Sequence, residues 1–282
     1  MSTKKTIGGV IAAILILVIS NIAGTLPASL LYMLNMPEWI CNITAGISYL
    51  VIAYLLIRLL VTKILKISME AMGMPKFSVK PGFLIMALIL PAAVTLAFIL
   101  FVNGDYISSG INGEKAASGI ALGILYTGMA AGFVEEMLFR GIILNLIRNK
   151  WNTVAAVIIP SVLFGVIHLT EVESFTATDA VLLIIAGTAV GTLFSVIAIR
   201  SGSVWNGAVV HSIWNIIMIG GILQIGSTPS ETSIMSYVIN DSSSLLTGGT
   251  FGVESSVIAM GGYILAAIAA LLMTKKKVAT KA

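Results

Sequence analysis

Eight runs of mostly apolar residues, each about as long as a helix that crosses a lipid bilayer, recur along this chain of 282 residues. They cover residues 7–33, 39–61, 82–103, 118–143, 153–169, 180–199, 203–226 and 255–273. Charged residues make up 10% of the sequence, whereas about 25% is usual in a soluble domain. We therefore expect an all-α, polytopic membrane protein, in which residues 1–282 form a single membrane domain with about eight transmembrane helices.

The basic residues between these runs predict how the helices are oriented. Of the 16 Lys and Arg residues, only Lys115 falls on the side opposite to all the others. Because basic residues accumulate on the cytoplasmic side, we expect both chain ends in the cytoplasm of a multi-pass plasma-membrane protein. Residues 227–254, rich in Ser, Thr and Gly, would then form a mobile outer loop. The basic residues lie at span ends without interleaved aromatic residues, which argues against a nucleic-acid partner.

Two adjacent glutamates, Glu135 and Glu136, interrupt the run 118–143. An ionisable group inside a membrane costs roughly 2.5–3.5 kcal/mol on insertion scales, so it marks a functional site unless a structural partner explains it. In a helix, Glu136 and Arg140 are four residues apart and share a face, which predicts a structural ion pair. Glu135 points about 100° away, which leaves it available as a base or a metal ligand. The alternative is a charged helix end that reaches the membrane interface.

Both histidines of the chain lie in predicted membrane helices, His168 in Phe-Gly-Val-Ile-His and His211 in His-Ser-Ile-Trp-Asn. A single histidine in an apolar helix is usually a core residue. Two histidines, two carboxylates and the amide of Asn215 at membrane depth instead favour a common site. If residues 149–152 join two antiparallel helices, Glu135 and His168 lie about 16 residues, or roughly 24 Å, from the turn and meet at one height. We therefore expect the site between the fourth, fifth and seventh helices.

A carboxylate, two imidazoles and an amide are the groups needed to activate a water and to stabilise the oxyanion formed at a peptide carbonyl. They favour hydrolysis. The sequence has no Gly-x-Ser-x-Gly, His-Glu-x-x-His or Walker-type motif, so the hydrolase and nucleotide-binding classes that use these motifs are not supported. The single cysteine, Cys41, excludes disulfides and cysteine-based zinc sites within one chain.

Three motifs occur in order along the chain: Glu-Glu-x-x-x-Arg at 135–140, Phe-x-x-x-His at 164–168 and His-x-x-x-Asn at 211–215. They resemble the motifs of the CAAX protease and bacteriocin-processing family of intramembrane endopeptidases, also called the CPBP or Abi family. The resemblance covers residues from about 117 to 222 and implies an eight-helix fold that hydrolyses peptide bonds near the membrane.

The resemblance also implies roles for individual residues. Glu135 and His168 would activate water, and His211 and Asn215 would be oxyanion stabilisers or metal ligands. A zinc mechanism with Glu135, His168 and His211 as candidate ligands and a metal-free glutamate mechanism both stay open, so the cofactor is unknown. The expected partners are membrane lipid and a peptide or protein substrate, for which a lipidated protein and a bacteriocin or signal precursor are alternatives.

Two other classes of function use the same kinds of residue. One is a non-catalytic membrane scaffold or bacteriocin immunity protein on the same fold, against which the intact motifs count. The other is a proton-coupled transporter with Glu135 and the histidines as a relay, but the sequence lacks the broken helices in two corresponding halves that an inverted repeat would produce. Peptide hydrolysis is therefore the favoured function.

Overall fold

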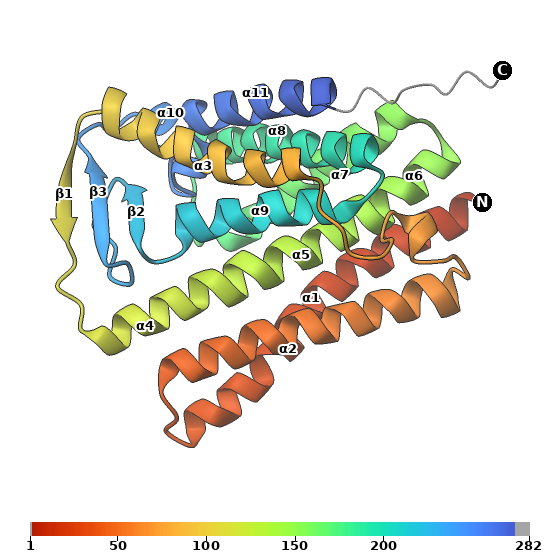
Figure 1. Cartoon of the computed structure of the whole chain (residues 1–282), viewed down its shortest axis with the longest axis horizontal. Helices are drawn as coiled ribbons and strands as arrows, with labels where there is room; N and C mark the ends of the chain where they lie inside the picture. Colours follow the sequence, from red (N-terminus) through yellow and green to blue (C-terminus); the bar gives the residue numbers. More distant parts are fainter. Residues whose placement is uncertain (1, 274–282) are drawn as a thin grey trace.

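The computed structural model describes residues 2–273, and its main helices lie side by side in one bundle (Figure 1). Its long helical segments are α1 (Thr3–Met33), α2 (Glu38–Leu59) with its continuation η1 (Leu60–Ile64), α3 (Pro81–Phe101), α7 (Thr153–Ile167) with η5 (His168–Glu171), α8 (Ala177–Ser201), α9 (Val204–Ile219) and α11 (Val257–Met273). A further long helix covers Gly113–Lys150. The structure is thus the all-α polytopic fold expected from the sequence. In the described part, six helices are long and apolar enough to cross a membrane, and two shorter apolar helices, α9 and α11, accompany them.

The helix that carries the glutamate pair is longer than its apolar run, 118–143, predicted. It has 38 residues, or about 57 Å at the usual rise. Its consecutive segments are α4 (Gly113–Ala121), η3 (Leu122–Ala130), α5 (Ala131–Glu135), η4 (Glu136–Ile143) and α6 (Leu144–Lys150). The segments η3 and η4 are π-helical, a wider form that is frequent at functional sites. Glu135 and Glu136 lie at the junction of α5 and η4.

The long helix divides the bundle into two parts. In Figure 1, α1 and α2 lie on one side of it, and α3, α8, α9 and α11 lie on the other. A small sheet closes the end of the molecule opposite the N-terminus. The glutamate pair is therefore covered by helices from both parts.

The seventh predicted span, 203–226, was too long. The helix α9 ends at Ile219, because the chain turns at Gly220 and Gly221. Gly221 has a φ of 80°, a left-handed conformation that a glycine adopts without a Cβ clash. The residues that follow form a strand, β2 (Leu223–Gly226).

The prediction that residues 227–254 form a mobile loop was wrong, because this segment contains regular structure. This segment contains β3 (Met235–Ile239), the short helix α10 (Ser244–Thr247) and the start of η6 (Val253–Ser255). Strand β3 pairs antiparallel with β1 (Gly104–Ser108) and parallel with β2, in the order β1-β3-β2. Two large side chains of β3, Tyr237 and Ile239, are each 4% exposed, so packing against the helices orders a segment whose composition resembles a loop.

Candidate active site

The glutamate pair faces α9 because the long helix and α9 approach each other closely at a glycine. A Cβ atom on Gly132 would lie 2.6 Å from Ser212 Oγ and 2.9 Å from the Ser212 backbone nitrogen. A larger residue at Gly132 would therefore push the two helices apart. Glu135 and Glu136 follow Gly132 by about one turn, so this close approach places both carboxylates against His211.

Glu136 and Arg140 form a buried ion pair, with 2.8 Å between Glu136 Oε1 and Arg140 Nη1 and 0% exposure of both side chains. Arg140 Nη2 also donates a hydrogen bond to the carbonyl oxygen of Gly191 at 3.1 Å. The guanidinium carbon lies 4.7 Å from the ring centre of Phe164 and 5.2 Å from that of Phe194. These contacts compensate the buried charge through an ion pair, a hydrogen bond and aromatic faces.

His211 lies between the two glutamates. Its Nδ1 is 3.3 Å from Glu136 Oε1, and its Nε2 is 3.8 Å from Glu135 Oε2. The imidazole stacks on the ring of Phe194, with 4.6 Å between centroids. On α9, Gly207 leaves room for the carboxylate, because a Cβ atom there would lie 2.9 Å from Glu136 Oε2. Glu136 therefore orients the His211 ring as well as pairing with Arg140, a role that the sequence reasoning missed.

His168 ends α7, and the phenylalanine of its motif packs directly on it. The rings of Phe164 and His168 are 4.3 Å apart, and His168 Nδ1 lies 2.7 Å from the carbonyl oxygen of Phe164. Because a carbonyl can only accept, Nδ1 carries the proton in this hydrogen bond. In a neutral His168, the lone pair is then on Nε2, which lies 4.0 Å from Glu171 Oε1. Phe164 also contacts the guanidinium of Arg140, so its ring lies between the Glu136–Arg140 ion pair and His168 and contacts both.

Asn215 lies one turn after His211 on α9. Its Nδ2 donates a hydrogen bond to the carbonyl oxygen of Thr127, in η3, at 2.8 Å. An amide nitrogen has two hydrogens, so one N–H remains for another acceptor. Because the contact with Thr127 fixes the side chain, the direction of this second N–H is fixed as well.

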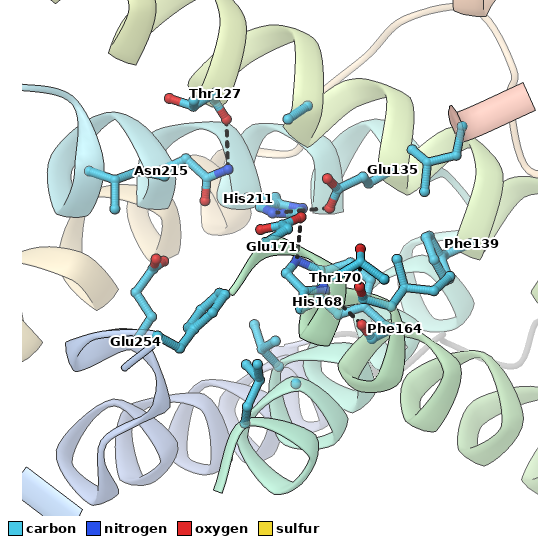
Figure 2. A pocket seen from close by; sticks show the side chains of 18 of the residues that line it. Thr127, Glu135, Phe139, Phe164, His168, Thr170, Glu171, His211, Asn215 and Glu254 are labelled. Carbon is cyan, nitrogen blue, oxygen red and sulfur yellow. Dashed lines mark hydrogen bonds and ion pairs between the residues drawn. The ribbon is translucent and has the colours of Figure 1, made fainter. Parts of the chain in front are cut away.

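All four predicted catalytic residues, Glu135, His168, His211 and Asn215, line one cavity of about 480 Å³, which we call the central cavity. Figure 2 shows them around the cavity together with two further carboxylates, Glu171 and Glu254. Further residues of the lining are Val18, Asn21, Ile22, Tyr49, Tyr126 and Trp214. Residues from α1 to α11 thus line the cavity, and not those of the motif helices alone.

The two further carboxylates differ in how visible they were in the sequence. Glu171 follows His168 by three residues, which places it on the same helical face. Glu254 lies in the connection before α11 and accepts a hydrogen bond from Trp214 Nε1 at 2.6 Å. Burial raises the pKa of Glu254 above its usual range. No sequence motif near Glu254 predicts its place in the site, because the tertiary fold of the connection brings it to the cavity.

The structure changes one expected pairing. We expected Glu135 to act beside His168, but the histidine within 4.0 Å of the Glu135 carboxylate is His211. His168 instead lies beside Glu171. Glu135 and His168 line the same cavity without direct contact, which leaves space for a water or a substrate between them.

The candidate metal ligands do not form a metal site in this arrangement. Within residues 2–273, no group of three or more His, Cys, Asp and Glu side chains is placed to hold one metal ion. Metal sites need ligands at about 2 Å from a common point, and Glu135, His168 and His211 do not provide such a set here.

A comparison with protein families agrees with the three motifs. Residues 117–217 match the family described as type II CAAX prenyl endopeptidase Rce1-like. The match covers a little over a third of the chain and includes Glu135, His168, His211 and Asn215. No curated protein matches the chain. The family resemblance seen in the motifs is thus confirmed over residues 117–217, where this multi-pass membrane protein is similar to the Rce1-like type II CAAX prenyl endopeptidases.

Proposed function

We propose that this protein is an intramembrane endopeptidase of the CAAX protease type, which hydrolyses a peptide bond near the membrane. The observation that carries the proposal is the grouping of Glu135, His168, His211 and Asn215 around the central cavity. The match of residues 117–217 to a protease family supports it. A site enclosed by helices also limits competing water, which strengthens the electrostatic interactions within it.

Glu135 is the general base of the proposed reaction. Its Oε2 is buried and has no hydrogen-bond partner among the described residues. Arg140 is occupied by Glu136, so the Glu135 carboxylate remains free to take a proton from water. His168 Nε2 accepts the second hydrogen bond of this water and orients it, because Nδ1 is held by the Phe164 carbonyl.

His211 and Asn215 stabilise the oxyanion. With Nδ1 directed to the Glu136 carboxylate, a protonated His211 can donate from Nε2 to the oxygen that becomes charged. The second N–H of Asn215 is a neutral donor from the same helix face. The water oxygen forms a bond to the carbonyl carbon, the C–N bond then breaks, and the proton held by Glu135 passes to the leaving amine.

The substrate is a peptide or protein in contact with the membrane. Lipidated proteins and bacteriocin or signal precursors are the candidate substrates, and the residues of the central cavity do not by themselves distinguish them. Membranes that carry the wild type and Glu135→Ala can be compared for new peptide termini by mass spectrometry. We expect termini that occur only with the wild type. An identical set of termini in both membranes would favour the non-catalytic scaffold.

A further inference from the structure

Part of the central cavity is built by helices outside the segment that matches the protease family. The helix α1 contributes Val18, Asn21 and Ile22, and α2 contributes Tyr49. The family match begins at residue 117, so this wall is a property of the rest of the chain. It brings polar groups to the cavity that the proposed mechanism does not use.

Asn21 is a polar residue in the middle of an apolar helix. It lies 18 residues after the first residue of α1 and 12 before the last, or about 27 Å and 18 Å along the axis. At such a depth a polar group without a partner is unfavourable. Asn21, Tyr49 and Tyr126 line the same cavity, and the rings of Tyr49 and Tyr126 lie 5.6 Å apart. The three residues together form a polar cluster in the cavity wall.

Two close helix contacts fix the position of this polar cluster. A Cβ atom on Gly24 would lie 2.6 Å from Tyr49 Cα, and one on Gly46 would lie 2.7 Å from the carbonyl carbon of Leu125. Asn21 precedes Gly24 by three residues, and Tyr49 follows Gly46 by three. The glycines therefore hold α1 against α2 and α2 against η3 within one turn of the cluster.

The cluster lies beside the proposed base and at the edge of the bundle. Tyr49 is 1% exposed and lines the central cavity together with Glu135. Val18 and Ile22 line the central cavity and are also 50% and 60% exposed. At α1 the cavity therefore reaches the outer surface of the helix bundle, where a membrane-embedded chain could contact it.

A peptide bound for cleavage brings its own backbone N–H and C=O groups into this cavity. These groups need partners where water is scarce. An asparagine side chain offers both a donor and an acceptor, the same pair that a peptide unit presents. The amide group of Asn21, which lines the cavity together with Tyr49 and Tyr126, is therefore suited to bind a backbone and not a particular side chain.

We propose that Asn21, positioned by Tyr49 and Tyr126, hydrogen-bonds one peptide unit of the substrate and aligns the chain for attack by the water on Glu135. This inference rests on the proposed function and assigns the substrate-binding wall to α1 and α2. Asn21 is a substrate-binding residue in this account, and the two tyrosines are positioning residues.

The test uses the full-length protein in nanodiscs and a fluorogenic reporter peptide cleaved by the wild type. Asn21→Leu should raise KM roughly two- to tenfold, the worth of one neutral hydrogen bond, with kcat within about twofold. Thr25→Val removes a polar group one turn away that does not line the cavity and is the matched control. Tyr49→Phe, which removes one hydroxyl only, should give a smaller rise in KM and provides a second variant if Asn21→Leu folds poorly.

A set of reporter peptides, each with one amide replaced by an ester, locates the contact. One replacement should raise KM for the wild type and have no further effect on Asn21→Leu. Equal effects of every ester on both proteins, or an unchanged KM in both variants, would overturn the inference while leaving the proposed function intact. A wild type that cleaves no peptide, or a Glu135→Gln variant that cleaves normally, would overturn both.

Discussion

Replacement of Arg140 by glutamine should destabilise the protein strongly. The guanidinium is 0% exposed, lies 2.8 Å from Glu136 and donates to the Gly191 carbonyl. Arg140→Gln removes the positive charge and leaves the Glu136 carboxylate buried, with the His211 ring 3.3 Å away. The loss is that of a buried carboxylate without its cation, and not only that of one hydrogen bond.

Breaking a buried ion pair from one side costs about 3–5 kcal/mol. For a chain of this size, such a loss lowers the unfolding midpoint by about 6–20 °C. The assay is the fraction of folded protein that survives heating in nanodiscs, measured by size-exclusion chromatography. Arg148→Gln is the matched control, because Arg148 is exposed on the same long helix and a surface charge contributes within about 1 kcal/mol.

A double variant separates the charge effect from the packing effect. Glu136→Gln combined with Arg140→Leu leaves no stranded charge, so it should recover part of the lost stability. It should not recover activity, because His211 would lose the carboxylate that orients it. If Arg140→Gln survives heating like Arg148→Gln, the structural role of the ion pair is refuted.

Four further predictions concern packing, orientation, pH and metal. Gly132→Val should separate the long helix from α9 and abolish activity, whereas Gly261→Val, where a Cβ has open space, should not; activity per folded molecule decides. In a cysteine-free background, Ser243→Cys should react with an impermeant maleimide in intact cells and Lys76→Cys should not; the reverse labelling would invert the proposed topology. Burial raises the pKa of Glu254, so this residue's contribution to stability is present below the pKa of an unfolded glutamate and is lost as pH rises through the pKa of the folded protein. Glu254→Gln should therefore be more heat-stable than the wild type at neutral pH and lose this advantage at acidic pH. A difference in heat stability that does not vary with pH would contradict this. Chelator treatment should leave activity unchanged, and a loss that zinc restores would show that the histidines bind metal.

The sequence was informative about the fold and the motif residues for a physical reason. Charged groups are expensive in a bilayer, so Glu135, Glu136 and the two histidines stand out against apolar runs. The spacing of Glu136 and Arg140 also determines that they share a helix face. The apolar runs located the six long helices of the described part and the two shorter ones, α9 and α11, to within a few residues at most ends, because the bilayer sets the length of a spanning helix.

The contacts between helices could not be predicted in the same way. The pairing of Glu135 with His211 depends on how closely α9 approaches Gly132, and sequence spacing does not give this distance. Glu254 belongs to a polar connection whose strand is ordered by packing, so its return to the cavity needs the tertiary fold. The second role of Glu136 was missed because its i,i+4 partner already explained its charge.

The role of Glu135 as the general base is tested by the turnover of purified Glu135→Gln on a peptide that the wild type cleaves. The substitution keeps the size of the side chain and removes the base, so we expect kcat to fall by at least about a hundredfold with an unchanged unfolding midpoint. Glu173→Gln, which alters an exposed carboxylate outside the central cavity, should keep wild-type turnover. A folded Glu135→Gln protein that cleaves the peptide at the wild-type rate would show that Glu135 is not the base.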